Sequence, residues 1–540
     1  MRKLPLIILC LLCTSSLLKG QEGYLVSFTD KDNTPYSVDS PSEFLSQRAI
    51  DRRVRQQISI TAQDLPVNPT YIDSLIKAGI DVRHSSKWFN AAIVFSANAT
   101  LMDTLQRVSF IKAVEKTKPI VSPTKQAAKF ESILPGLKSH HDSDYGQAWM
   151  QMKTVNGHLL HERGYTGGGM HIAVIDAGFQ FADNLPAFQH LWDNGQILGT
   201  KDFVNASSDI FAEHHHGTNV LSIIGGKITN NFLGAAPDAS YWLLRSEDAT
   251  YEMPIEPDYW ICAAEFADSV GVDIINTSLG YYEFDSPELS YSRIDMDGSS
   301  RISQAAEIAA SKGMLVVTSA GNEGQKYWRH IGAPADARDI ISVGAIAADS
   351  TKGSFSSFGP SFDNRIKPEV SALGVSTAFQ HTNGGIALGS GTSFSAPVVS
   401  GLAACTWQAN PNKTALEIRE MIIKSANQYH NPDEKLGFGI PNFDQALRTD
   451  AEIIEDTDKN WLVSPNPFYK YLSIRFYKGM PHGLVHVSMY DLIGNLKLKK
   501  TFSNKNEIRL NEVGAFANGI YILIIENNTF KQHVKVIKSY

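Results

Sequence analysis

Five apolar runs alternate with helical patterns between about residue 145 and residue 447. The runs are IAVID (172–176), YWLLR (241–245), DIINTS (273–278), MLVVTSA (314–320) and IISVGA (340–345). Because they are apolar at consecutive positions, they predict strands buried on both faces, and the helical segments between them predict a mostly parallel sheet that is covered on both sides. Sheets of this kind bind ligands at the carboxyl ends of their strands. We therefore expect a three-layer α/β/α domain with its site at that edge.

The pattern changes on either side of this domain. Residues 21–140 alternate strand-like runs (YLVSF, AAIVFS, FIKAV) with helical ones (EFLSQRAIDRR, YIDSLIKAG, TLMDTLQRV), and they end in a polar stretch that indicates an exposed, cleavable linker. After an acidic linker at 451–460, residues 461–540 form β runs separated by Gly and Asn turns. We predict a small α/β domain over 21–140, the α/β/α domain over 141–450 and a small all-β sandwich over 461–540.

Residues 1–20 predict a signal peptide. Arg2 and Lys3 precede an uncharged apolar run at 4–13, and polar residues follow it before Gly20. The run is short for a membrane span, and neither Cys10 nor Cys13 follows the small residue that a lipoprotein signal places before its cysteine. We expect cleavage near Gly20 and soluble export.

Composition narrows the classes of function. With 43% hydrophobic and 19% charged residues, the chain has the make-up of a well-cored globular protein. Its formal net charge of −7 argues against a nucleic-acid-binding protein, which would normally present a basic surface. Once the signal is removed, Cys262 and Cys405 are the remaining cysteines. Each lies in an apolar helical stretch, which favours two free buried thiols over one disulfide.

Four polar residues of the central domain stand where chemistry is expected. Asp176 ends the strand HIAVID and Asn322 follows the strand LVVTSA, while His216 and Ser393 lie in glycine turns that open helices. A serine at a helix N-terminus meets N–H groups and a dipole suited to an incipient oxyanion, to which an amide can also donate. A carboxylate at a strand end can orient an imidazole, which then acts as a base.

Each of these residues also has a plain structural interpretation. A serine in an isolated GTS is usually an N-cap, and Asp and Asn after strands are often turn residues. His214 and His215 beside His216 raise the alternative of zinc, but no HExxH motif or Cys/His cluster accompanies them. Ser395 occupies the place of the second glycine of GxSxG, which makes an α/β-hydrolase elbow a poor fit.

Taken as a set, the motifs resemble those of the subtilases, the subtilisin-like serine peptidases. The matching segments are YTGGGMHIAVIDAGF, HHHGTNV, LGAAPDA, DIINTSLG, SAGNEG, KPEV and GTSFSAP, and they are distributed through the stretch from about 145 to 447 that resembles the family. The resemblance implies a subtilisin-like fold in which Asp176 orients His216, the general base and then acid. It makes Ser393 the nucleophile and Asn322 a donor to the oxyanion.

The resemblance also implies where a substrate binds. Ser278, Leu279 and Gly280 are expected to pair with an extended peptide as an added strand, and Ala320 and Gly321 to line one wall of the S1 pocket. Main-chain recognition of this kind admits unfolded polypeptides of many sequences. The loop before LGAAP is short, so a calcium site there is not indicated, although structural calcium elsewhere is possible. We expect no metal or cofactor in the chemistry.

Both flanking regions have resemblances of their own. Residues 24–118, marked by RAIDRR and SKWFNAAIVFS, resemble the inhibitory propeptides of exported subtilases; the alternative is a structural domain that the mature enzyme retains. The last region, with SPNPF (464–468), MYDLIGN (489–495) and ANGIYILIIENN (517–528), resembles the C-terminal sorting domain of the type IX secretion system in Bacteroidetes. The alternative is a generic adhesion sandwich.

These resemblances imply a serine endopeptidase, secreted or held at the cell surface after export through the periplasm. It would hydrolyse peptide bonds by an Asp-His-Ser triad through an acyl-enzyme. Its partners would be polypeptide substrates, its own propeptide as an intramolecular inhibitor and the secretion machinery, with no nucleic acid among them. The alternative is a catalytically inactive subtilase-fold protein for surface binding or adhesion. The presence of all four catalytic residues argues against this alternative.

Overall fold

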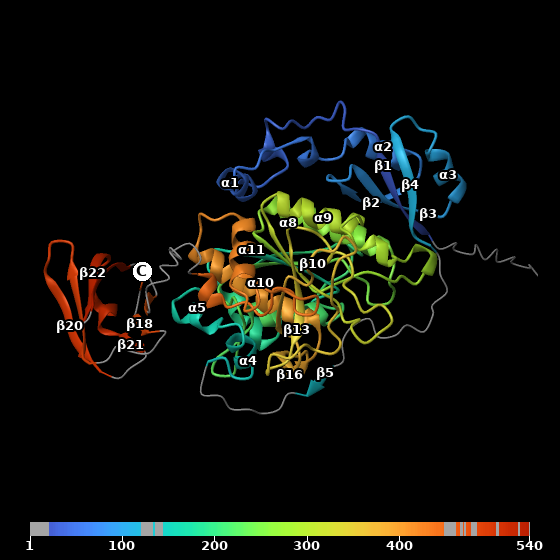
Figure 1. Cartoon of the computed structure of the whole chain (residues 1–540). Coiled ribbons are helices and arrows are strands. Elements are labelled where there is room, and N and C mark those ends of the chain that lie inside the picture. The colour runs from blue at the N-terminus through green and yellow to red at the C-terminus, as the bar shows by residue number, and fades with distance from the viewer. Residues whose placement is uncertain are drawn as a thin grey trace, which may run out of the picture.

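The computed structural model describes residues 21–119, 133–135, 144–447, 461–464, 468, 471–476, 483–503, 507–527 and 530–538. These residues form an N-terminal, a central and a C-terminal domain (Figure 1). The predicted signal peptide, most of the polar linker and the acidic linker lie outside the described residues, as do the predicted boundaries at 140 and 450, which stay predictions. In the part that is described, no helix has the length and apolarity that a membrane span requires.

The N-terminal domain is a four-stranded antiparallel sheet in the order β2-β3-β1-β4, with two of its three α-helices, α2 and α3, on one face. Its elements are β1 (Glu22–Phe28), α1 (Gln47–Arg55), α2 (Pro69–Lys77), β2 (Asp81–Ser86), β3 (Ala91–Ser96), α3 (Ala99–Leu105) and β4 (Ile111–Lys118). Three of the strands and all three helices coincide with predicted runs. Strand β2, DVRHSS, was not predicted because it lacks an apolar run and owes its conformation to pairing with β3.

The central domain is built on a seven-stranded sheet in the order β14-β13-β12-β11-β6-β10-β7. Every neighbouring pair is parallel. The strands are β6 (His171–Asp176), β7 (Ile197–Asp202), β10 (Ser240–Arg245), β11 (Ile274–Thr277), β12 (Leu315–Ser319), β13 (Ile341–Ile346) and β14 (Val370–Leu373). The five predicted runs are β6, β10, β11, β12 and β13. The two edge strands were not predicted, because ILGTKD is polar and VSAL is short.

Helices cover both faces of this sheet. Ile172 and Val174 of β6 pack in the same core as α7 (His216–Gly225), α10 (Thr392–Ala409) and α11 (Ala415–Lys424). Their neighbours Ala173 and Ile175 pack on the opposite side with α8 (Ile255–Val270) and α9 (Arg301–Ser311). The predicted three-layer α/β/α arrangement is therefore confirmed, and consecutive apolar residues supply two separate cores.

Shorter elements complete the central domain. They are β5 (Ile133–Pro135), α4 (Trp149–Lys153), α5 (His158–Glu162), α6 (Gln189–Asp193), β8 (Lys227–Ile228), β9 (Phe232–Leu233), β15 (Thr377–Gln380), β16 (Ile386–Gly389) and α12 (Phe443–Ala446). Cys262 and Cys405 are both buried and free, as the sequence indicated.

The N-terminal domain packs with the uncovered face of its sheet on α8 and α9 (Figure 1). Arg52 of α1 is buried there, and its guanidinium donates to the carbonyl oxygens of Asp268, Val272 and Lys312 near the C-terminal ends of both helices. Burial opposes ionisation of Asp268, but the charges of Lys87, Arg52 and Arg53 outweigh it and hold the pKa of that carboxyl well below its usual range. RAIDRR is thus the segment that anchors this domain.

The second marked segment, SKWFNAAIVFS, makes further polar contacts with the central domain. Glu265 of α8 accepts hydrogen bonds from the Ser86 hydroxyl at 2.5 Å and from the backbone N–H groups of Lys87 and Trp88 at 2.7 and 3.1 Å. Lys87 Nζ lies 2.9 Å from Asp268 Oδ2. The two motifs that carried the resemblance of this domain are therefore among the segments that bind it to the central domain.

The C-terminal domain is a small β-sandwich, as predicted. One sheet has the order β17-β18-β21 and the other β20-β19-β22-β23. The strands are β17 (Trp461–Ser464), β18 (Leu472–Phe476), β19 (Val485–Asp491), β20 (Leu496–Phe502), β21 (Glu507–Leu510), β22 (Gly519–Glu526) and β23 (Lys531–Lys538). Ile474, Val487 and Leu523 pack in the core between the sheets. Part of SPNPF lies outside the described residues.

Candidate active site

The predicted site residues gather at the carboxyl edge of three adjacent strands. Asp176 ends β6, Ser278 follows β11 directly and Ala320 follows β12. Strand order reverses between β6 and β11, because the chain runs outward to β7 on one side and to β14 on the other. A crevice forms at such a reversal in parallel sheets. The topology therefore places the predicted site residues at the carboxyl edge of the sheet.

Asp176 and His216 form a buried hydrogen-bonded pair. The Nδ1–H of His216 donates to Asp176 Oδ1 at 2.7 Å, and the backbone N–H of Ala177 donates to the same oxygen at 2.8 Å. The exposed fractions of Asp176 and His216 are 0% and 2%. Gly217 permits this approach, since a Cβ there would lie 2.4 Å from the Gly178 carbonyl oxygen and 2.9 Å from Asp176 Cβ. The carboxylate thus fixes both the tautomer and the orientation of the ring.

Ser393 lies in the first turn of α10. Its hydroxyl donates to the Ser278 carbonyl oxygen at 3.2 Å, and the Ser278 hydroxyl donates to the Ser393 carbonyl oxygen at 2.9 Å. The ring of Phe394, the next residue along α10, lies 6.2 Å from the imidazole of His216 between centroids. These contacts bring the serine, the histidine and the predicted substrate-binding strand to one place.

The amide of Asn322 is oriented by the residue before the serine. Asn322 Oδ1 accepts hydrogen bonds from the backbone N–H of Thr392 at 2.9 Å and from its hydroxyl at 3.0 Å. These two hydrogen bonds hold the oxygen end of the amide, so the Nδ2 donors lie at its other end. This orientation suits a donor to an oxyanion beside Ser393.

The predicted substrate-binding residues line the same edge. Ser278 and Leu279 are buried, whereas Gly280 is exposed. Ala320 is buried, and Gly321 has φ of +104° and would place a Cβ 2.9 Å from Ser357 Oγ, so only glycine fits. The two segments follow adjacent parallel strands and therefore run side by side.

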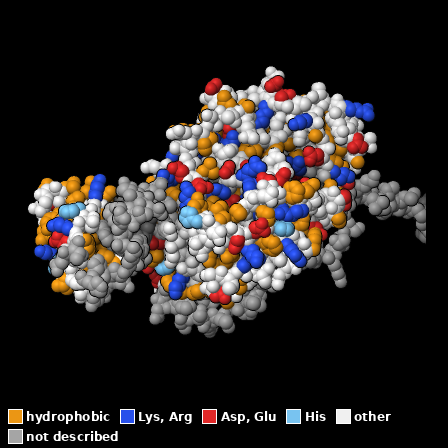
Figure 2. Space-filling model, viewed as in Figure 1, with side chains coloured by type: hydrophobic (Ala, Val, Ile, Leu, Met, Phe, Trp, Pro, Cys, Tyr) orange, Lys and Arg blue, Asp and Glu red, His pale blue; other side chains and the backbone are white. Residues whose placement is uncertain are grey.

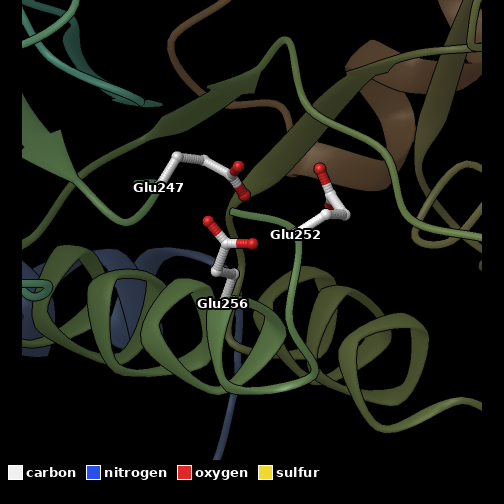
Figure 3. Close-up of side chains that lie close together, drawn as sticks. All are labelled: Glu247, Glu252 and Glu256. Atoms are coloured by element: carbon white, nitrogen blue, oxygen red, sulfur yellow. The ribbon is translucent and has the colours of Figure 1, made fainter. Parts of the chain in front are cut away.

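An acidic cluster beside this edge was not singled out by the sequence patterns. Glu247, Glu252 and Glu256 each place one carboxylate oxygen within 4.8 Å of the others (Figure 3). Hard cations such as Ca²⁺ prefer oxygen ligands of this kind. The structure gives two of these carboxylates a further role: Glu256 accepts from the backbone N–H groups of Asp248 and Met253, and Glu247 accepts from the Tyr281 hydroxyl. The cluster thereby fastens the loop after β10 to the segment that directly follows β11 and contains Tyr281.

Two pKa shifts follow from burial near the site. Burial, and then the charges of His216 and His381, lower the pKa of His215, so this ring stays neutral beside the pair. Burial, and then the charge of Glu247, raise the pKa of Tyr281 well above its ordinary value, so the Tyr281 hydroxyl remains a donor.

On the surface, acidic and basic side chains are interspersed over the face in view (Figure 2), which agrees with the modest net charge.

Comparison with known proteins identifies similar sequences for each domain. Residues 167–439 match the sequence model of the Subtilase family. Residues 23–131 match the Peptidase S8 propeptide domain, Bacteroidota, and residues 462–539 match the Secretion system C-terminal sorting domain.

Individual relatives show the same likeness. Subtilisin NAT of Bacillus subtilis subsp. natto is 28% identical over 313 residues, which are 57% of this chain and 74% of that protein. Subtilisin of Bacillus pumilus is 29% identical over 299 residues, 54% of this chain and 96% of the relative. The solved structure of fervidolysin from Fervidobacterium pennivorans, described as a keratinolytic enzyme related to subtilisin, has a TM-score of 0.54 at 18% identity. That alignment covers 96% of this chain and 76% of fervidolysin, and it shows a shared fold.

Proposed function

Since this chain belongs to the subtilase family and is a serine endopeptidase, we propose that Asp176, His216 and Ser393 cleave its substrates through an acyl-enzyme intermediate. The observation that carries this proposal is the buried Asp176–His216 hydrogen bond of 2.7 Å at the strand edge where Ser393 meets Ser278. The matches also confirm the propeptide and sorting-domain resemblances, and with the latter export to the medium or the cell surface.

In the first half of the reaction the serine attacks. His216 takes the proton of the Ser393 hydroxyl at Nε2, because its Nδ1–H is committed to Asp176. The Ser393 oxygen then bonds to the scissile carbonyl carbon. The negative charge on the carbonyl oxygen is stabilised by the Asn322 amide and by backbone N–H at the start of α10. The imidazolium gives its proton to the leaving amine, and the acyl-enzyme remains.

In the second half a water molecule replaces the amine. The water attacks the ester carbon while His216 removes a proton from it, and the same donors stabilise the second oxyanion. The ester bond to Ser393 breaks and the serine regains its proton from His216. We propose that side chains and backbone groups of the chain suffice for these steps, without a cofactor.

A covalent label tests the proposed chemistry. A fluorophosphonate probe should modify the processed protein at Ser393, because only an activated serine reacts with it. Peptide mapping of the labelled protein identifies the site. A processed, folded sample that takes up no label would instead support the inactive binding or adhesion protein.

We also propose that the N-terminal domain is the intramolecular inhibitor. Its buried contacts to α8 and α9 support a stable complex, and its last strand, β4, ends at Lys118 with Nζ 4.0 Å from the centre of the Tyr251 ring. Tyr251 belongs to the loop that the acidic cluster fastens to the substrate-binding strand. The chain therefore leaves this domain beside the crevice, from where it can enter the crevice as a substrate would.

Replacing Asn322 with alanine should weaken catalysis without emptying the site. Loss of one oxyanion donor lowers kcat by roughly 10² to 10³ in subtilisin, with little change in KM. The measurement is steady-state hydrolysis of a peptide by the processed variant. Asn442→Ala is a matched control, since its Oδ1 only caps α12 by accepting from Gln445 N–H. A raised KM with unchanged kcat would make Asn322 a binding residue.

Deleting residues 455–540 should leave an active central domain that stays inside the cell, in the periplasm. Among the residues that the structure describes, none beyond 447 belongs to the cores of the central domain, so the deletion is expected to leave these cores intact. A sorting domain is an address that a receptor reads, so its loss should change location and not kcat. Activity is assayed in the medium and in cell fractions of a host with this secretion pathway. Efficient release of the truncated enzyme would contradict the sorting role.

A further inference from the structure

The end of strand β10 carries a buried arginine beside the catalytic pair. Arg245 is in register with Asp176 of β6 on one side and with Asp202 of β7 on the other. It is 4% exposed. The backbone N–H of Ser246, the next residue, donates to the Asp176 carbonyl oxygen at 3.0 Å. A charged side chain is rarely buried unless it is paired, so the partners of Arg245 should explain its burial.

The guanidinium of Arg245 contacts three different segments. Its Nε–H donates to the Ala177 carbonyl oxygen at 3.1 Å, and Nη1 donates to Asp202 Oδ2 at 2.9 Å. Nη2 lies 3.2 Å from Glu213 Oε2. Ala177 follows the aspartate of the catalytic pair, and Glu213 lies three residues before its histidine. A planar guanidinium holds these directions in a fixed geometry, which a lysine cannot do.

The turn after β6 and the segment before α7 also contact one another directly. Gly178 has φ of +147°, and a Cβ there would lie 2.5 Å from the backbone nitrogen of His214 and 2.8 Å from Glu213 Cβ. The Gln180 N–H donates to the His214 carbonyl oxygen at 3.4 Å. Their close approach is what permits the 2.7 Å hydrogen bond between Asp176 and His216. A shift of either segment would therefore be transmitted to that bond.

We propose that Arg245 is a positioning residue, which holds the Asp176–His216 pair in register by fastening the turn after β6 to the segment before α7. We call the contacts of Arg245 with Ala177, Asp202 and Glu213 the clamp. Asp202 is its fixed end, because Asp202 Oδ1 also accepts hydrogen bonds from the N–H groups of Val204 and Asn205 at 2.8 and 2.9 Å. Glu213 is the movable end, since its side chain is 30% exposed and gains water when it is released. The inference rests on the proposed roles of Asp176 and His216.

The clamp predicts a loss in kcat that KM does not share. Displacement of a catalytic group by about 1 Å can cost roughly 100-fold in rate. We expect Arg245→Met to lower kcat by about 30- to 100-fold, with KM within about twofold, because Arg245 touches neither substrate-binding segment. Arg245→Lys should recover part of the loss. Glu213→Gln, which keeps the Asp202 pair and the fold, should lower kcat by about 3- to 10-fold.

A double variant shows whether the two residues act together. If Arg245 works through Glu213, Glu213→Gln should cost little more once Arg245→Met is present, so the two losses are not additive. Rates are measured on processed protein whose active sites have been titrated with the fluorophosphonate. Arg163→Met is the control, because Arg163 pairs with Asp444 between α5 and α12 and should affect Tm alone.

Three results would each contradict the clamp. The first is a wild-type kcat in folded Arg245→Met, and the second is an effect of that variant on KM alone. The third is a double variant in which the kcat losses of Arg245→Met and Glu213→Gln are fully additive. If Arg245→Met does not fold, a wild-type kcat in Glu213→Gln decides against the clamp by itself. The proposed triad is tested separately, because an inactive Ser393→Ala beside a fully active Arg245→Met would refute the clamp and leave the triad standing.

Discussion

Replacing Ser393 with alanine is expected to give a folded chain that has no peptidase activity and is recovered as the uncleaved precursor. The change removes one oxygen from the first turn of α10 and with it the hydrogen bond to the Ser278 carbonyl. The Ser278 hydroxyl keeps its bond to the backbone of residue 393, so the local fold is retained. In subtilisin, loss of the nucleophile lowers kcat by a factor of about 10⁶.

Loss of processing follows if the enzyme cuts its own linker. The N-terminal domain ends beside the loop at Tyr251, and the polar linker that continues from it is the predicted site of cleavage. A rate lowered by about 10⁶ leaves this bond intact over any practical incubation. The measurement is the size of the purified chain and its rate on a peptide substrate, before and after a trace of active enzyme is added.

Ser395→Ala is the matched control for this variant. Ser395 lies on the same turn of α10 and its hydroxyl donates to the Thr392 carbonyl oxygen at 3.0 Å, a bond within the helix. The Ser395→Ala variant should therefore be processed and active. Maturation of purified Ser393→Ala without added protease would contradict self-processing, and residual activity near that of Ser395→Ala would contradict the nucleophile itself.

The fold could be predicted from the sequence wherever burial leaves an unbroken apolar run. Strands β6 and β12 are such runs, and the structure has Asp176 at the end of the first and Asn322 three residues after the second, as the sequence indicated. Strands β7 and β14 escaped prediction. Strand β7 has one neighbour in the sheet and is exposed or half-buried at most positions, so its sequence is polar, whereas β14 is buried throughout but is only four residues long.

The candidate site could be predicted only where motifs mark it. The roles of His216 and Ser393 came from their glycine turns and from the family resemblance, not from geometry. Arg245 carried no local signal, because its meaning depends on Asp202 and Glu213, which lie 43 and 32 residues earlier in the chain. The anchoring role of Arg52 likewise depends on helices more than 200 residues away. Contacts between remote segments are set by tertiary packing, which periodicity does not record.

The second large effect is expected at Asp176. Asp176→Ala should lower kcat by about 10⁴, as the loss of this carboxylate does in subtilisin, while KM changes little because no substrate-binding segment touches the side chain. Without the carboxylate, the buried Nδ1–H of His216 loses its acceptor, and the imidazolium formed during attack loses its counter-charge. Asp336→Asn is the matched control, a buried aspartate that accepts from Ser303 and Gly298 away from the site and should alter Tm but not kcat.

Asp176→Asn separates the two functions of this carboxylate. Asp176 Oδ1 accepts from both His216 Nδ1 and the Ala177 N–H. An asparagine must keep its oxygen at that position, because its NH₂ group would face the Ala177 donor. The correct histidine tautomer is then preserved and only the charge is lost, so Asp176→Asn should retain more activity than Asp176→Ala. Steady-state kinetics of both processed variants decide the matter: equal kcat values would mean that the asparagine turns its NH₂ toward His216 and that Ala177 does not govern the tautomer.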